Sequence, residues 1–121
     1  MKWIATLLLL TPSIAAAETE PEFHLCAHYV QKSEVGEQAG GGWPVIVKLT
    51  ALGAKSFEKF TEANVGRMSR IIVDGRQFLR ATIREPISEG TLYGEFSSRE
   101  IASAWQRAFV DESTSAPCGA N

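Results

Sequence analysis

The segment from Ile71 to Trp105 constrains the fold more than any other part of this chain of 121 residues. Asp74 and Gly75 stand between two runs of apolar and β-branched residues, and this pair favours a two-residue hairpin turn with positive φ. A stiff connector that contains Pro86 then leads to a third short run. The hairpin arms and the strand after the connector are predicted at residues 68–73, 77–83 and 91–96.

Two amphipathic helices are predicted from apolar residues that recur at helical spacing. Thr50 is a suitable N-cap for the first helix, which ends near Val65 because Gly66 suits the left-handed position that closes a helix. Ser97 begins the second helix with a Ser-x-x-Glu capping box that ends at Glu100. The predicted buried stripes are Ala54, Phe57, Phe60, Thr61 and Val65 in the first helix and Ile101, Ala104, Trp105, Ala108 and Phe109 in the second.

Two further strands are predicted ahead of the first helix. Residues 23–32 alternate with the period of two that is typical of a strand, a polar and glycine-rich loop follows at residues 33–42, and residues 45–49 form the next strand. The order is therefore strand, strand, helix, strand, strand, strand, helix. The predicted fold class is α+β: a single, mostly antiparallel sheet of about five strands with both helices packed on one face.

The first 17 residues have the pattern of a secretory signal peptide. Lys2 supplies a positive start, a short apolar run follows, and the alanines at positions 15–17 suit cleavage after Ala17. A membrane anchor is the alternative, but the run is far shorter than the ~20 residues needed to span a bilayer. We expect a periplasmic protein with one domain at residues 18–121, made of a core at 23–110 and a flexible tail at 111–121.

The charge of the chain argues against nucleic acid as a partner. The full sequence has 12 basic and 14 acidic residues, and removal of residues 1–17 takes away Lys2 alone, so 11 basic residues remain and the formal net charge falls from −2 to −3. The basic residues are spread along the chain rather than clustered. The sequence also gives no support for membrane insertion or for an anionic membrane surface.

The two cysteines, Cys26 and Cys118, lie near opposite ends of the mature chain. In an oxidising compartment they predict one disulfide, which would close a loop of ~90 residues and stabilise the fold by about 4–5 kcal/mol in chain-entropy models. The alternative is a zinc or copper site formed by His24, Cys26 and His28 on one face of the first strand. A bridged cysteine cannot supply a thiolate, so the two interpretations exclude each other.

No pattern in the sequence indicates an enzyme or a cofactor. Asp74 is explained by the hairpin turn, and the three glycines before Trp43 lack the Lys-Ser/Thr of a phosphate-binding loop. Glu58 and Glu62 lie four residues apart on the first helix, where a solvated face explains them. We therefore expect a protein that is not an enzyme, carries no cofactor and acts by binding.

The order of several short motifs resembles the head subdomain of the first periplasmic domain of SecD, in the SecDF protein-export family. The resemblance covers residues 45–109 and rests on the segments Asn64-Val65-Gly66, Ile72-Val73-Asp74-Gly75, Ile83-Arg84-Glu85-Pro86-Ile87 and Gly94-Glu95-Phe96-Ser97. It departs from the family at Ala81, where SecD usually has proline, and at Glu89-Gly90, where SecD usually has paired glycines.

The resemblance implies a partner that is protein or extended polypeptide, because the SecD head is thought to contact the emerging preprotein. An edge strand on the open face of the predicted sheet could capture such a partner by strand addition. We place this surface on the second hairpin arm and the connector. The candidate contacts are Phe78 as the apolar residue, Arg80 and Arg84 as the polar rim, and Trp43 as an alternative.

Overall fold

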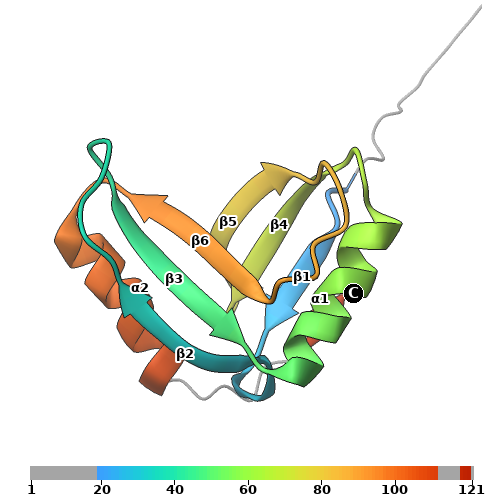
Figure 1. Cartoon of the computed structure of the whole chain (residues 1–121), viewed down its shortest axis with the longest axis horizontal. Helices are drawn as coiled ribbons and strands as arrows, with labels where there is room; N and C mark the ends of the chain where they lie inside the picture. Colours follow the sequence, from blue (N-terminus) through green and yellow to red (C-terminus); the bar gives the residue numbers. More distant parts are fainter. Residues whose placement is uncertain (1–18, 112–117, 121) are drawn as a thin grey trace, which may run out of the picture.

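Two β-sheets, rather than the single predicted sheet, form the framework of the chain (Figure 1). The computed structural model describes residues 19–111 and 118–120, so the predicted signal peptide and most of the predicted tail lie outside the described residues. The α+β class is confirmed. The described elements are β1 (Glu22–Leu25), the short 3₁₀ helix η2 (Ala27–Tyr29), β2 (Val30–Val35), β3 (Trp43–Leu49), α1 (Ala51–Ala63), β4 (Met68–Val73), β5 (Arg76–Thr82), β6 (Thr91–Phe96), α2 (Arg99–Asp111) and β7 (Gly119–Ala120).

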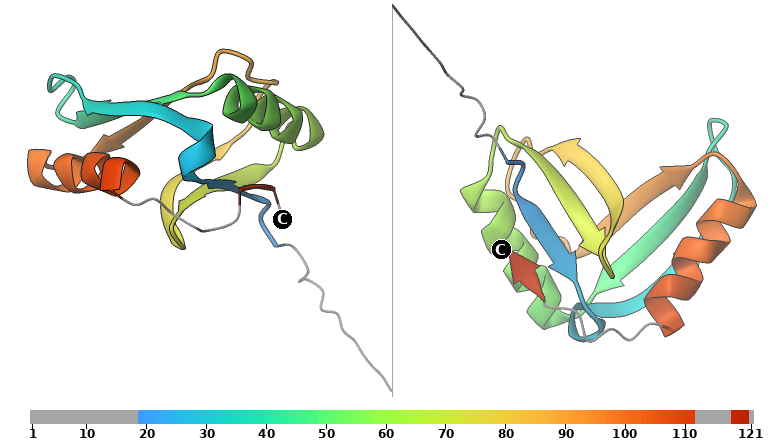
Figure 2. Two further views of the ribbon diagram at one scale, coloured as in Figure 1. Left: turned by 90° about the horizontal axis from the view of Figure 1, so that it is seen from below. Right: turned by 180° about the vertical axis from the view of Figure 1, so that it is seen from behind.

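The strand order differs between the two sheets. The four-stranded sheet has the order β5-β4-β1-β7, with β1 parallel to β4 and the other pairs antiparallel. The three-stranded sheet has the order β2-β3-β6 and is antiparallel throughout. Helix α1 lies against β1, β7 and η2, whereas α2 lies against β2, β3 and β6. Figures 1 and 2 show the sheets diverging as the two arms of a V. The prediction of two helices on one face of one sheet is therefore wrong.

The division into two sheets arises at Cys26, where the predicted first strand is interrupted. The amide of Tyr29 donates to the carbonyl of Cys26 at 3.0 Å and closes the 3₁₀ turn. The chain leaves the four-stranded sheet after Leu25 and enters the three-stranded sheet at Val30. The alternation of apolar and polar residues continues through the turn, so the pattern by itself does not reveal the break.

One hydrophobic core joins both sheets and both helices, and it contains two groups of aromatic rings. Phe23 on β1 contacts Phe57 and Phe60 of α1, with ring centroids 5.1 and 5.2 Å away. The rings of Phe78 and Trp105 lie 5.2 Å apart in the second group, which joins β5 to α2. Burial of each such side chain contributes about 1.5–3 kcal/mol relative to exposure, so the first group holds α1 to its own sheet and the second ties α2 to the four-stranded sheet.

The predicted hairpin is confirmed, and it contains an irregularity that changes the exposure of one predicted site residue. Asp74 and Gly75 have φ values of 51° and 78°, as a type I′ turn requires. Ile72 pairs with Gln77 and Ile71 with Leu79, so Phe78 is the extra residue of a bulge. The bulge turns the Phe78 side chain toward the core. With strict alternation along β5, this side chain would lie on the other face of the strand, away from the core.

The predicted start of the first helix is confirmed, whereas its end and the start of the second helix differ slightly from the prediction. Thr50 caps α1, because its hydroxyl accepts from the amide of Gly53 at 3.1 Å. Helix α2 is capped by Ser98 rather than by the predicted Ser97, since the Ser98 hydroxyl accepts from the amide of Ile101 at 3.1 Å. Val65 lies beyond the end of α1 and is exposed, so it is not part of the buried stripe.

Candidate functional site

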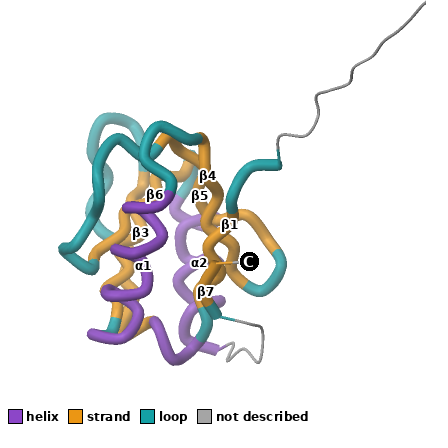
Figure 3. The backbone as a smooth tube through the Cα atoms, turned by 90° about the vertical axis from the view of Figure 1, so that its right-hand side faces the viewer, coloured by secondary structure: helices purple, strands orange, loops and turns teal. Residues whose placement is uncertain are grey.

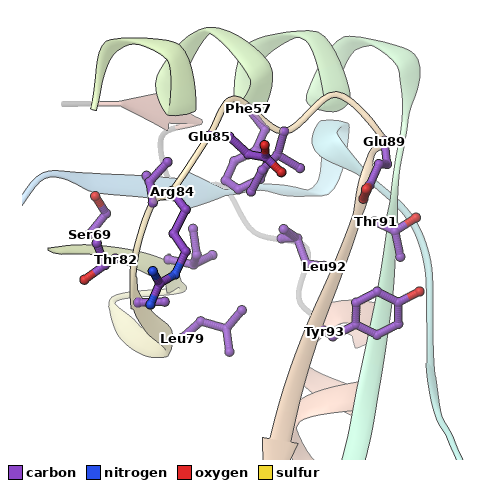
Figure 4. Close-up of a pocket in the computed structure, with 14 residues that line it drawn as sticks. Phe57, Ser69, Leu79, Thr82, Arg84, Glu85, Glu89, Thr91, Leu92 and Tyr93 are labelled. Atoms are coloured by element: carbon purple, nitrogen blue, oxygen red, sulfur yellow. The ribbon is translucent and has the colours of Figure 1, made fainter. Parts of the chain in front are cut away.

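A groove of about 410 Å³ lies between β5 and β6, bordered by the connector at residues 83–90 (Figure 4). We call it the β5–β6 groove. Apolar side chains make up most of its wall, and charged side chains come only from the connector. Its lining residues are Phe57, Ser69, Ile71, Leu79, Ala81, Thr82, Ile83, Arg84, Glu85, Ile87, Glu89, Thr91, Leu92 and Tyr93.

Both strands that border the groove are edge strands. In the described part of the chain, β5 pairs only with β4 and β6 pairs only with β3. The lining includes consecutive residues of the chain, 81–83 on one side and 91–93 on the other. Because consecutive side chains of a strand point to opposite faces, the groove borders the strand edges and not only one face of each sheet. An edge of this kind presents N–H and C=O groups that can pair with another extended segment.

The connector that borders the groove is held at several points along its length. The amide of Ile87 donates to the hydroxyl of Thr61 on α1 at 2.9 Å. The carbonyl of Ile83 accepts from the amide of Gly66 at 2.7 Å, and the carbonyl of Gly90 accepts from the amide of Leu49 at 2.8 Å. These bonds fix both ends and the middle of the connector, so the groove is formed before any ligand enters it.

The groove closes where β6 crosses β5 at Gly94. A Cβ atom added to Gly94 would lie 3.0 Å from Phe78 Cζ and 3.0 Å from Leu79 Cδ2. Any larger residue at this position would therefore have to displace the Phe78 and Leu79 side chains by a few tenths of an ångström. Away from this crossing the sheets diverge, as Figure 1 shows, and the groove occupies the space between them.

The groove combines apolar side chains with the backbone groups of two strand edges. The half-buried Leu79 and Ile87 supply apolar contact area above the buried Ile83 and Leu92, and Tyr93 is 63 % exposed at the opening. Arg84 and Glu89 stand on the connector with opposite charges. Nothing in this arrangement resembles a nucleophile with its base. The groove offers apolar side-chain surface and, along the two strand edges, backbone hydrogen-bonding groups.

Two of the predicted contact residues have structural partners inside the protein. Phe78 is only 4 % exposed and packs in the core, so the prediction that it contacts a partner at the surface is wrong, and the bulge is the reason. Arg80 is exposed and forms a two-point ion pair with Glu20, with Nε and Nη2 at 3.0 and 2.6 Å from the carboxylate oxygens. The hydrogen bond from Arg80 holds the pKa of Glu20 below its ordinary value.

The other two predicted contact residues lie in different places. Arg84 lines the β5–β6 groove, in agreement with its predicted location on the connector. Trp43 begins β3 and pairs with Phe96, and the guanidinium of Arg99 lies 5.7 Å from the centre of its ring. Trp43 is not among the lining residues of the groove. The structure therefore brings only Arg84 of the four predicted residues to this site.

The predicted disulfide is confirmed, and the alternative metal site is not supported. Cys26 is bonded to Cys118, with the two Cα atoms 5.1 Å apart. Because Cys26 is oxidised, it cannot act as a thiolate ligand. His24 approaches Glu22 at 3.3 Å from β1, whereas His28 lies on η2. Among residues 19–111 and 118–120, no group of three metal-ligating side chains is present.

Several groove residues were not singled out from the sequence, namely Leu79, Ile83, Ile87 and Leu92. The signal for two of them was present, since Leu79 and Ile83 alternate with polar residues along the hairpin arm, together with Ala81. In the single sheet predicted from the sequence, this alternation would indicate only one of the two sheet faces. The approach of β6 to the same strand depends on a second sheet, which the sequence pattern does not predict.

Comparisons with known proteins agree with this fold. A family model described as the SecDF P1 head subdomain matches residues 15–104. The SecD translocase subunit of Dictyoglomus turgidum is 40 % identical over 62 residues, which are 49 % of this chain and 16 % of that protein. The SecD subunit of Koribacter versatilis is 32 % identical over 79 residues, or 64 % of this chain and 15 % of that protein.

Two solved structures of SecDF resemble this one. The first, described as a membrane component that enhances protein export, has a TM-score of 0.66 and 28 % identity over 78 % of this chain and 43 % of that chain. The second, SecDF in a super-membrane-facing form, has a TM-score of 0.63 and 29 % identity, and covers 78 % of this chain and 13 % of that one.

The fold is thus that of an α+β domain of the type found in the SecDF export proteins. The chain belongs to the SecDF P1 head subdomain family, as the sequence motifs indicate. It spans 16 % or less of the curated SecD relatives described above. None of the helices in the described residues is long and apolar enough to cross a bilayer.

Proposed function

We propose that this protein is a periplasmic binding module for extended polypeptide, linked to protein export, and that the β5–β6 groove is its binding site. The observation that carries the proposal is the position of an apolar groove between two unpaired strand edges. An extended segment can pair its backbone with such an edge and place alternate side chains in the groove. Backbone pairing does not depend on side-chain identity, which suits a partner whose sequence varies.

Membership of the SecDF family supports the link to export. The relatives are translocase subunits, and one related SecDF is described as enhancing protein export. In this chain the family resemblance covers the head alone, so the role we propose is contact with polypeptide rather than the work of the whole translocase. The partner is unfolded or extended protein, and the groove is the surface that receives it.

The proposed periplasmic location rests on the signal-peptide pattern of residues 1–17. Expression of the full sequence in a bacterium should give a periplasmic protein whose N-terminal residue is Glu18. Mass measurement of the intact protein from the periplasmic fraction tests this directly. A protein that retains Met1 and stays with the membrane fraction would instead identify the segment as an anchor.

A blocking substitution tests the proposed binding site. Ala81 is exposed and lines the groove, so Ala81→Arg should fill the groove with a long charged side chain. Gln77→Arg is the matched control, because Gln77 is exposed on the same strand but does not line the groove. Fluorescence anisotropy with a labelled, permanently unfolded polypeptide should show binding by the wild type and the control and weak binding by Ala81→Arg. Equal binding by all three proteins would contradict the proposal.

A further inference from the structure

The C-terminal strand β7 is the shortest strand of the four-stranded sheet and covers the edge of β1. It consists of Gly119 and Ala120, which pair antiparallel with His24 and Phe23. Figure 3 shows β7 alongside β1, and β7 also lies against α1. Without β7, the strand order of this sheet would end at β1, and the backbone edge of β1 would be open.

The pairing of two residues is too short to hold a strand in place without further support. Even a complete two-stranded hairpin is at best marginally stable in water. The neighbouring Cys118 is joined covalently to Cys26, which directly follows β1. The bridge therefore keeps β7 at a high local concentration beside its partner strand, although 92 positions separate the two cysteines in the sequence.

The two sulfur-bearing residues differ in their access to solvent. Cys118 belongs to the exposed residues, whereas Cys26 is only 3 % exposed. An external thiolate therefore reaches the Cys118 side of the bridge more readily. Attack at Cys118 therefore disturbs the core less than attack at Cys26 would.

We propose that the Cys26–Cys118 bridge is a redox-operated latch that holds β7 over the edge of β1 and releases it on reduction. The reductant is a dithiol. One of its thiolates attacks the Cys118 sulfur and forms a mixed disulfide, and Cys26 leaves as a thiolate and takes up a proton. The second thiol of the reductant then displaces the Cys118 thiol, and the reductant departs as a disulfide.

Release of the latch changes which strand edges the protein presents. In the oxidised protein, the four-stranded sheet ends at β5 on one side and at β7 on the other. In the reduced protein, β1 becomes an open edge next to α1, and open edges pair with other extended segments. This inference concerns the edge of β1 and does not depend on what binds the β5–β6 groove.

Hydrogen–deuterium exchange measured by mass spectrometry tests the latch on the full mature chain, oxidised or treated with dithiothreitol. Reduction should raise the exchange rate of those amides of residues 22–25 that face β7 by about tenfold or more, as expected for a locally released edge. Exchange in β3 and β6 should stay unchanged. No increase at residues 22–25, or an equal increase in β3 and β6, would overturn the proposal, because β7 would then hold without the bridge or the bridge would stabilise the whole domain.

A variant that keeps the bridge separates the strand from the disulfide. Gly119 has a φ of +88°, and a Cβ atom added to it would lie 3.4 Å from the Tyr29 hydroxyl. Gly119→Val should therefore displace β7 while Cys26 and Cys118 remain bonded, and it should raise exchange at residues 22–25 as reduction does. Unchanged protection in this variant would mean that β7 does not cover the edge, and the proposal would fail. Cys118→Ser should match the reduced wild type.

Discussion

The hydroxyl of Thr61 on α1 accepts a hydrogen bond from the amide of Ile87 on the connector, at 2.9 Å. The same hydroxyl donates to the carbonyl of Glu58 at 2.9 Å, and Thr61 is fully buried. One buried polar group thus joins the helix to the border of the β5–β6 groove. The contact links the stability of the domain to the shape of its proposed binding site.

Replacement of Thr61 by valine should lower the free energy of unfolding by about 1–3 kcal/mol, because the Ile87 amide loses its partner in a buried position. Valine has nearly the shape of threonine, so packing changes little. Thr61→Ser retains the hydroxyl and is the matched control, with a smaller loss from the missing methyl group. Urea denaturation of the three proteins measures the difference, and a loss in Thr61→Ser as large as in Thr61→Val would assign the effect to packing instead.

Phe78→Ala should destabilise the protein by about 3–5 kcal/mol, the usual cost of removing a buried aromatic ring. Phe78 contacts Phe96, Trp105 and Phe109, with ring centroids 5.0–5.6 Å away. Thermal unfolding followed by circular dichroism is the measurement. A melting temperature close to that of the wild type would show that Phe78 is a surface residue, as the sequence had suggested.

The sequence predicted local features well where one short signal determines one structure. The Asp74-Gly75 turn and the α1 cap at Thr50 are correct, because turn and cap geometry depend on neighbouring residues alone. The disulfide between Cys26 and Cys118 also follows from the number of cysteines and the predicted compartment.

Features that depend on distant contacts were not predictable in the same way. The break at Cys26 preserves the alternating pattern, so one strand was expected where the chain passes between two sheets. The bulge at Phe78 reverses the facing of one side chain without any glycine to indicate it. The groove therefore became visible only when both sheets were in place, because its two walls come from separate sheets.

Tyr93→Ala should weaken polypeptide binding and leave stability nearly unchanged. The side chain is 63 % exposed at the groove, and exposed substitutions of this kind change stability by about 0.5 kcal/mol or less. An aromatic contact at a binding site is worth roughly 1 kcal/mol or more, so Kd should rise about fivefold to tenfold.

The control for Tyr93 is Leu52→Ala. Leu52 lies on α1, is 62 % exposed and does not line the groove, so it matches Tyr93 in exposure but not in place. Anisotropy titrations with the unfolded polypeptide should separate the two variants. If Leu52→Ala weakens binding as much as Tyr93→Ala does, the binding surface lies elsewhere on the molecule.

Acid should remove the contribution of the Glu20–Arg80 ion pair to stability. The hydrogen bond and positive charge of Arg80 lower the pKa of Glu20 in the folded protein below its ordinary value of 4.5. A carboxyl group with a lowered folded pKa stabilises the protein at pH values above its unfolded pKa, and this contribution is lost as the pH falls through the folded value. Arg80 stays protonated across this range, since Glu20 raises its pKa further.

Glu20→Gln should therefore be less stable than the wild type at neutral pH, and the difference should close as the pH falls from about 5 to 3, the range in which glutamate protonates. The pair is exposed, so the difference at neutral pH should be small and should shrink in high salt. Urea denaturation at a series of pH values gives the measurement. Glu37→Gln is the control, because Glu37 lies in the loop between β2 and β3. A stability difference that persists at pH 3, or that appears equally in Glu37→Gln, would contradict the assignment to the Glu20 carboxylate and its arginine partners, Arg80 and Arg70.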